Sequence, residues 1–313
     1  MGDAVDARLR DLARRWAAFW PGADTEAMAF DVRARAQAAA GAWGLSELAP
    51  FARGDVALVA AAGDAVLKVS PRGHVDERGM LAEGTALEHW GPTGAVPRVR
   101  GRRDGGLTLL LERVAPGEPL DDSGLPLERR LDALGALARR LHGAGPPPAA
   151  VPHIGEDYAH GWRTALAGRP ERDELEELLA PRADDALLHA DLHGGNALSA
   201  GGGAWRAIDP HAVRGDRHAD VWALIDPLVP ALPQDAVEAA SVARSRLERY
   251  AAAAGLDVDR AAAWTRLRAR AEALATDARG ADADPDDREW AARLHRTADA
   301  LAPRRPREGS PST

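Results

Sequence analysis

The segment L-H-A-D-L-H-G-G-N-A-L at 188–198, followed by A-I-D-P at 207–210, constrains this chain more than any other. It places Asn196 five positions after Asp191 and Asp209 thirteen positions after Asn196, with a short apolar run before each part. Amide and carboxylate oxygens suit a hard cation such as Mg²⁺. The spacing therefore predicts a magnesium site made by Asn196 and Asp209, beside a carboxylate, Asp191, that is free to act as a base.

Two alternative roles for these residues stay open at this point. In one, the segment is a hairpin whose polar side chains only satisfy its own turns, since Asp and Asn are common in loops. In the other, His189, His193 and Asp191 form the metal site of a hydrolase. That site gives no role to Asn196, and a site rich in oxygen ligands suits magnesium better than zinc. The two spacings, with an apolar residue before Asp209, favour the magnesium site over both alternatives.

A second signal comes from residue types that the chain almost lacks. Of its 40 basic residues only Lys68 is a lysine, and Asn196 is its only asparagine. In a sequence that has drifted towards arginine, a retained lysine indicates a position where a compact ammonium is needed and a planar guanidinium fails. Lys68 and Asn196 are therefore candidates for the functional site. The alternative is that both were retained by chance while the composition drifted.

The quoted motif resembles the catalytic loop and metal-binding aspartate shared by protein kinases and aminoglycoside phosphotransferases. Its form here, HADLHGGNAL…AIDPHAVRGDRHAD, is most similar to the streptomycin 6-phosphotransferase and hydroxyurea phosphotransferase group. The resemblance implies that Asp191 orients or deprotonates an acceptor hydroxyl, while Asn196 and Asp209 hold Mg²⁺ against the ATP phosphates. It also implies that His189 and Asp220 support the loop.

The same resemblance assigns residues nearer the N-terminus. Lys68, in the apolar strand V-L-K-V, is expected to contact the α- and β-phosphates and to pair with Glu83 on the next helix. Glu88 is the alternative partner. The glycine-rich loop that usually covers the phosphates is missing, because the equivalent turn F-A-R-G-D at 51–55 has one glycine, Gly54.

The fold implied is α+β and protein-kinase-like, with two lobes: a small antiparallel-sheet N-lobe and a mostly helical C-lobe. The apolar strand at 107–111 leads into Glu112 and Val114, whose backbone groups are expected at the adenine edge. We expect an N-lobe with two N-terminal helices over 1–113, a C-lobe with the catalytic loop and acceptor pocket over 114–301, and a disordered tail over 302–313.

Local patterns predict most elements of these lobes. Periodic apolar residues predict helices, and short β-rich runs bounded by Gly, Asp or Pro predict strands. The predicted helices lie at 4–20, 25–42 and 126–143 and through 221–301, with a helix pair or one bent helix at 156–180. The predicted strands lie at 56–61 and 65–70, and a catalytic hairpin is predicted at 186–209.

The acceptor is expected to be a small molecule. Only ten residues separate Asp209 from Asp220, whereas protein kinases use a much longer segment there to dock a peptide. Asp216 is expected to cap the following helix. Streptomycin carries two guanidinium groups, so further carboxylates are expected in its pocket. The candidates in the following helices are Asp226, Asp235 and Glu238.

Composition narrows the function further. The chain has no cysteine, which excludes disulfides and thiol chemistry. Its net charge of −8 argues against a nucleic-acid partner and mildly favours a cationic one. No apolar run reaches membrane-spanning length and no signal-peptide core is present, so we expect a cytoplasmic protein. A kinase for hydroxyurea or another metabolite, a protein kinase and a non-catalytic nucleotide-binding protein stay as alternatives.

Overall fold

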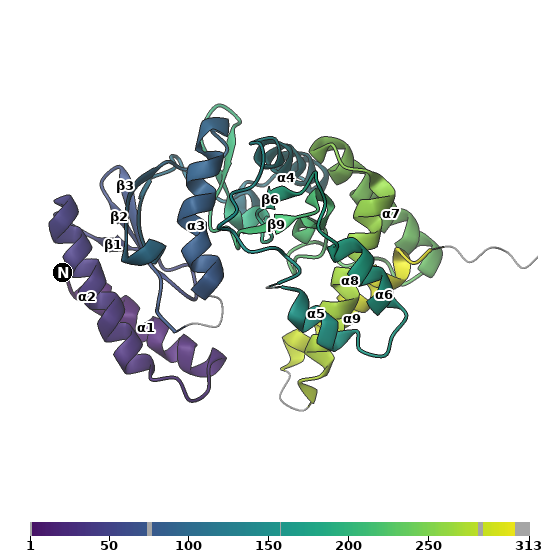
Figure 1. Cartoon of the computed structure of the whole chain (residues 1–313), viewed down its shortest axis with the longest axis horizontal. Helices are drawn as coiled ribbons and strands as arrows, with labels where there is room; N and C mark the ends of the chain where they lie inside the picture. The colour runs from purple at the N-terminus through teal and green to yellow at the C-terminus, as the bar shows by residue number, and fades with distance from the viewer. Residues whose placement is uncertain (1, 74–76, 157, 281–283, 304–313) are drawn as a thin grey trace, which may run out of the picture.

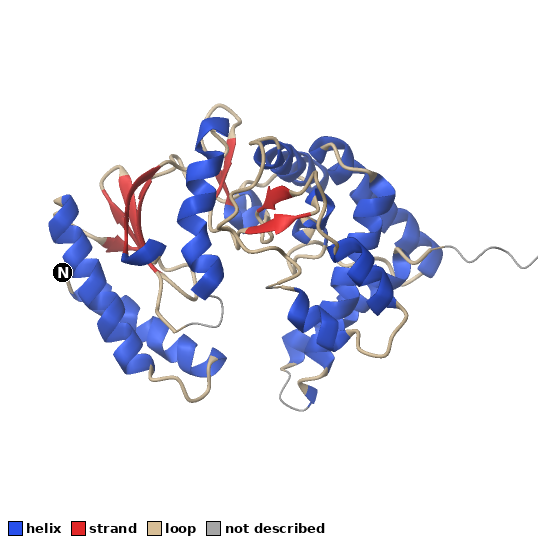
Figure 2. Ribbon diagram, viewed as in Figure 1, coloured by secondary structure: helices blue, strands red, loops and turns tan. Residues whose placement is uncertain are grey.

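The computed structural model describes residues 2–73, 77–156, 158–280 and 284–303. The chain forms a lobe built on an antiparallel sheet and a larger lobe made mostly of helices (Figures 1 and 2), which confirms the predicted α+β class. Most of the predicted tail at 302–313 lies outside the described residues. No helix in the described part of the chain is long and apolar enough to cross a membrane.

The first lobe contains one five-stranded antiparallel sheet flanked by helices. In spatial order, its strands are β1 (Ala49–Pro50), β2 (Leu58–Ala62), β3 (Ala65–Val69), β5 (Thr108–Glu112) and β4 (Val99–Arg103). The helices of this lobe are α1 (Asp3–Phe19), α2 (Thr25–Trp43) and α3 (Glu77–Trp90). Side chains alternate along β3, so Leu67 and Val69 enter a core shared with α1 and α2. Lys68 points to the opposite face, where α3 lies between the sheet and the helical lobe (Figure 1).

Two strands of this sheet are absent from the sequence prediction. β1 is only two residues long, and β4 has the sequence V-R-G-R-R, which lacks apolar alternation. β4 is an edge strand whose backbone pairs with β5. Its arginines are exposed, although Arg102 also donates to Thr85 and to the Leu81 carbonyl on α3. Gly101 lies against Trp43, and a Cβ at this position would sit 2.8 Å from the indole ring. Edge pairing of this kind leaves no periodic signal in the sequence.

The second lobe is a helical assembly. Its helices are α4 (Leu127–His142), α5 (Ala159–Ala165), α6 (Glu171–Leu179), α7 (Ala236–Ala254), α8 (Val258–Asp277) and α9 (Pro285–Ala300). The helix pair predicted at 156–180 is present as α5 and α6. The expectation of helices throughout 221–301 is wrong for residues 225–235, which form no helix. Pro227, Pro230 and Pro233 explain the difference, because each removes an N–H donor and disfavours helix at the preceding residue.

The catalytic region differs from the single hairpin predicted at 186–209. It contains two separate two-stranded sheets, formed by β6 (Ala186–Leu188) with β9 (Val213–Gly215) and by β7 (Ala197–Ser199) with β8 (Trp205–Ala207). The glycines at 201–203 join β7 to β8 as a turn, and all three have positive φ. Asp191 therefore lies in the loop between β6 and β7, and Asp209 follows β8.

Helices α4 and α7 pack closely through a glycine. A Cβ on Gly135 would lie 2.7 Å from the Cβ of Ala253 and 2.7 Å from the carbonyl oxygen of Tyr250. This approach sets α4, which carries His142, against α7. Gly161 in α5 has open space where its Cβ would be.

We predict that Gly135→Ala destabilises the chain by about 1–3 kcal/mol, because overpacking outweighs the better helix propensity of alanine. Gly161→Ala serves as the matched control and should stabilise by up to about 1 kcal/mol. Urea-induced unfolding of the three proteins measures both changes. Equal midpoints for the two variants would contradict the close approach of α4 and α7.

Candidate active site

A three-member ion cluster joins the two lobes. The Nζ of Lys68 lies 2.6 Å from Oε2 of Glu83 and 2.5 Å from Oδ1 of Asp209. Burial alone would lower the pKa of Lys68, but the charges of Asp209 and Glu83 outweigh it and raise the pKa. Glu88, the alternative partner, instead lies 3.7 Å from Arg102 on β4. The structure therefore pairs Lys68 with Glu83.

Asp191 and Asn196 form the second part of the site. Nδ2 of Asn196 donates to the carbonyl oxygen of Asp191 at 3.0 Å and to its carboxylate at 2.9 Å. The carbonyl of Asn196 accepts from the amide of Ile208, which brings the segment before Asp209 alongside. The Asp191 side chain is 31% exposed, so an external hydroxyl group can reach it.

The donor set fits Mg²⁺. With Nδ2 of Asn196 used on Asp191, its Oδ1 is the atom available as a ligand. Asp209 is 55% exposed although it contacts Lys68, which holds the pKa of the Asp209 carboxyl at about 2 and keeps it ionised. An amide oxygen and an anionic carboxylate are hard ligands, and Mg²⁺ commonly takes few protein ligands plus phosphate oxygens.

Asp220 supports the catalytic loop from inside the lobe. Its buried carboxylate accepts from the amides of His189 at 3.1 Å and Ala190 at 2.9 Å and lies 3.0 Å from Nε2 of His142. Burial would raise the pKa of Asp220, but these contacts with His142 and His189 lower it. The Tyr250 hydroxyl donates to the Asp220 carbonyl at 2.6 Å. The sequence predicts the supporting role of Asp220 but neither His142 nor Tyr250.

His189 orders the same loop through its ring. Nε2 lies 2.9 Å from the carbonyl oxygen of Ile208, and the ring stacks on Trp90 of α3 at 6.2 Å. Burial lowers the pKa of His189, so the ring is neutral and Nε2 carries the proton that it donates to this carbonyl. Nearby, Ala190 and Asp209 have φ of 60° and 57°, a left-handed conformation that non-glycine residues adopt only when their surroundings hold them there.

Asp216 ties the loop after β9 to α8. Its side chain accepts from the amide of His218 at 3.1 Å and caps the short 3₁₀ turn Arg217–Ala219, so the predicted capping role is confirmed. Its other oxygen accepts from Trp264 at 2.7 Å and from Arg260 at 2.5 Å. Burial would raise the pKa of Asp216, but its bonds to His218 and Trp264 lower it.

Of the three predicted acceptor carboxylates, the structure brings only Asp226 to Asp191. His193 lies between them, with Nδ1 3.5 Å from Asp226 and Nε2 3.9 Å from Asp191. Burial raises the pKa of Asp226. Asp235 is exposed and caps α7 by accepting from two amides, and Glu238 is exposed in the first turn of that helix. Within the described residues, neither of the two bonds to the group around Asp191.

Asp121 is a carboxylate in this neighbourhood that the sequence analysis misses. It lies in the 3₁₀ turn Leu120–Asp122, where Arg130 donates to Oδ1 at 2.8 Å. A Cβ on Gly194 would sit 2.0 Å from the same oxygen, so the side chain packs directly against the catalytic-loop backbone. Its Oδ2 is buried and has no hydrogen-bond partner among the described residues. An Asp in the D-D-S-G turn after Leu120 carries no local signal of such a contact.

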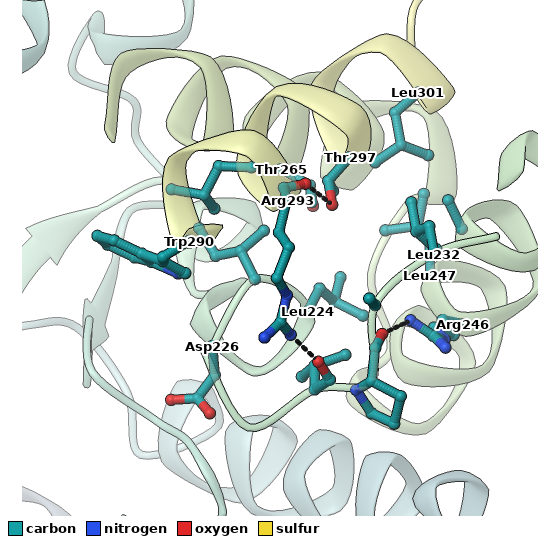
Figure 3. Close-up of a pocket in the computed structure, with 16 residues that line it drawn as sticks. Leu224, Asp226, Leu232, Arg246, Leu247, Thr265, Trp290, Arg293, Thr297 and Leu301 are labelled. Atoms are coloured by element: carbon teal, nitrogen blue, oxygen red, sulfur yellow. Dashed lines mark hydrogen bonds between the residues drawn. The ribbon is translucent and has the colours of Figure 1, made fainter. Parts of the chain in front are cut away.

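The loop that carries Asp226 is fixed to α7 and α9 through its backbone. Arg293 donates to the carbonyl of Val229, and Arg246 donates to the carbonyl of Pro230 at 2.7 Å. Both arginines point into a pocket between this loop and the helices (Figure 3). The loop is therefore held in place although it contains no regular secondary structure.

The residues predicted at the adenine edge follow β5. The carboxylate of Glu112 lies 3.0 Å from Arg206 on β8 and 3.3 Å from Arg98, so the side chain links the two lobes. The Glu112 amide donates to the carbonyl of Arg98 at 2.8 Å. The backbone groups expected to pair with a nucleotide base are therefore the carbonyl of Glu112 and the backbone of the buried Val114.

The turn at 51–55 is held by α1. Arg8 donates to the carbonyl of Gly54, and Nε1 of Trp16 donates to the carbonyl of Val56 at 3.0 Å. Arg53 forms an ion pair with Asp122, with Nη2 2.7 Å from Oδ2. Hydrogen bonds from α1 therefore fix the turn that has only one glycine.

Comparison with known proteins points to one family. Residues 50–280 match a family described as "Aminoglycoside/hydroxyurea antibiotic resistance kinase". The chain is 30% identical over 200 residues to streptomycin 6-kinase from Streptomyces glaucescens, covering 58% of this chain and 62% of that protein. It is 35% identical over 247 residues to hydroxyurea phosphotransferase from Kitasatospora aureofaciens, covering 71% and 66%. The matched regions thus span slightly less than two thirds of both relatives.

A solved structure shares the fold. An aminoglycoside phosphotransferase from Streptomyces rimosus, in complex with ADP and streptomycin, superposes with a TM-score of 0.52 at 19% identity, covering 78% of this chain and 98% of that one. At this identity the likeness shows the fold alone. The predicted protein-kinase-like fold class is therefore confirmed.

The ion cluster leads to a stability prediction. Lys68→Met should destabilise the chain by about 3–5 kcal/mol, because it leaves the buried carboxylate of Glu83 without its partner. Asp209→Asn should cost much less, since Asp209 is 55% exposed. Urea unfolding of both variants and of the Lys68→Met/Glu83→Gln pair tests this. Equal losses for Lys68→Met and Asp209→Asn, or no recovery in the double variant, would contradict the cluster.

Proposed function

The chain belongs to the aminoglycoside/hydroxyurea antibiotic resistance kinase family, and from this we propose that it transfers the γ-phosphoryl group of ATP to a hydroxyl group of a small molecule. The observation that carries the proposal is the convergence of two groups in one site. Lys68 is paired with Glu83 and Asp209, and Asp191 is oriented by Asn196. The first group suits phosphates and a metal ion, and the second suits an acceptor.

In the proposed reaction the acceptor hydroxyl oxygen attacks the γ-phosphorus as the bond to the β–γ bridging oxygen breaks. Asp191 takes the hydroxyl proton, and ADP is the leaving group. Lys68 donates to the α- and β-phosphates while Glu83 fixes its direction. Asn196, through Oδ1, and Asp209 would hold Mg²⁺, which when bound neutralises charge on the β- and γ-phosphates. His189 and Asp220 keep the loop in this geometry.

For the acceptor we propose a cationic molecule of the streptomycin type. Asp191 and Asp226 lie on either side of His193, and Asp121, which already pairs with Arg130, packs against Gly194. A guanidinium or ammonium group is the natural counterpart of a site with this excess of carboxylates. Asp235 caps α7 and Glu238 lies in its first turn, and within the described residues neither pairs with His193, so we leave both out of this pocket. Similarity to streptomycin 6-kinase supports the proposal.

Hydroxyurea is the second candidate acceptor. The relative named as a hydroxyurea phosphotransferase is 35% identical over 247 residues, a longer match than that to streptomycin 6-kinase. Hydroxyurea is uncharged, so it needs Asp191 but not Asp226 or Asp121. The two acceptors therefore make different demands on the same site.

Asp191→Ala tests the chemistry. We expect kcat to fall roughly 10²–10⁴-fold, because a positioned base is lost, with little change in ATP affinity. Phosphate mass gain on a panel of acceptors gives turnover, and calorimetry gives ATP binding. Asp259→Ala, an exposed acid on α8, is the control and should keep wild-type turnover. Half of the wild-type turnover in Asp191→Ala would exclude Asp191 as the base.

Asp226→Asn and Asp121→Asn test the acceptor. Each should raise KM for streptomycin more than it lowers kcat, and KM should also rise with salt because attraction between charges is screened. Asp235→Asn, at the exposed N-cap of α7, is the control and should leave KM unchanged, because asparagine keeps the cap. If hydroxyurea is phosphorylated and streptomycin is not, the cationic pocket is wrong while the kinase assignment stands.

A further inference from the structure

Arg268 contacts the catalytic loop from behind. It lies on α8 with 5% exposure, and its Nη2 donates to the carbonyl oxygen of Ala190 at 2.9 Å. Its guanidinium lies over three aromatic rings, with the carbon Cζ 4.5 Å from the ring centre of Trp222, 5.6 Å from Trp162 and 6.0 Å from Tyr158. Cation–π attraction of this kind stabilises a desolvated guanidinium.

No carboxylate pairs with Arg268 among the described residues, and its Nε is buried without a hydrogen-bond partner. Burying a charge without an acidic partner costs free energy unless other interactions compensate for the lost solvation. Arg266, two positions earlier on the same helix, shows the ordinary arrangement. It is 8% exposed and forms an ion pair with Glu174 on α6. Among the described residues, Arg268 instead contacts three aromatic rings and the carbonyl of Ala190.

The hydrogen bond from Arg268 falls on the peptide unit that joins Ala190 to Asp191. The amide of Ala190 donates to Asp220 at 2.9 Å, and its carbonyl accepts from Arg268, so the residue is held from both sides. Ala190 has φ of 60°, which an alanine keeps only under such constraint. The plane of the following peptide sets the direction in which the Asp191 side chain leaves the backbone.

We propose that Arg268 is a positioning residue for phosphoryl transfer, which fixes the 190–191 peptide and thereby aims the carboxylate of Asp191 at the acceptor hydroxyl. This inference rests on the proposed function. Arg268 contacts neither Lys68 nor Asp209, so its loss should affect the chemical step and leave nucleotide binding intact. A displacement of about 1 Å at a reacting group can cost roughly 10²-fold in rate.

The test compares Arg268→Met with Arg266→Met in the full chain. Arg268→Met should lower kcat about 10–100-fold and leave KM for ATP within about threefold. Arg266→Met loses a buried arginine of the same helix, so it reports the cost of packing and should leave kcat within about twofold. Hydrogen exchange of the peptide covering 187–198 should accelerate in the first variant and stay at the wild-type rate in the second.

Each outcome decides the proposal. An unchanged kcat and an unchanged rate of hydrogen exchange in Arg268→Met, or an equal loss of kcat in both variants, would overturn it.

If Arg268→Met does not fold, Arg268→Lys and Arg266→Lys repeat the comparison, because lysine keeps a donor but not the planar contact with Trp222. We then expect a several-fold lower kcat at position 268 only. If the wild type phosphorylates no acceptor, the proposed function fails, and hydrogen exchange alone still shows whether Arg268 fixes the loop.

Discussion

The buried carboxylate of Asp220 is the constraint on which the catalytic region depends. A charge without solvent needs a full set of donors, and Asp220 takes them from His142 on α4 and from the backbone of His189 and Ala190. The hydroxyl of Tyr250 on α7 binds its carbonyl. Two helices and one loop are therefore fixed relative to each other by a single residue, and any shift of one leaves a buried polar group unsatisfied.

The sequence predicts the part of the site that short motifs encode. The distances in sequence from Asp191 to Asn196 and Asp209 reflect one loop and one hairpin, so three members of the site come from a single local segment. Lys68 stands out because the chain has lost every other lysine. Its pairing with Glu83 is predicted by the family pattern, and the ion pair at 2.6 Å agrees with it. The roles of these residues stay proposals.

What the sequence does not predict depends on tertiary packing. Asp121 and Arg268 come from segments far from the loop in the chain, and one arginine among so many carries no compositional signal. Asp235 and Glu238 follow Asp226 closely in sequence, and this closeness alone favours a place in the acceptor pocket. Asp226 and Asp235 lie near opposite ends of the non-helical stretch 225–235, and its three prolines are the local signal that no helix carries the two acids on one face.

The way in which the loop after Asp226 is anchored affects which of its residues can change during evolution. Arg246 and Arg293 hold it through the backbone carbonyls of Pro230 and Val229, and every residue type has such a carbonyl. Side chains on this loop can therefore be exchanged without loosening its anchorage. Under the proposed function, a protein built in this way can change the molecules that it accepts by point substitution, while the residues proposed to hold the phosphates stay as they are.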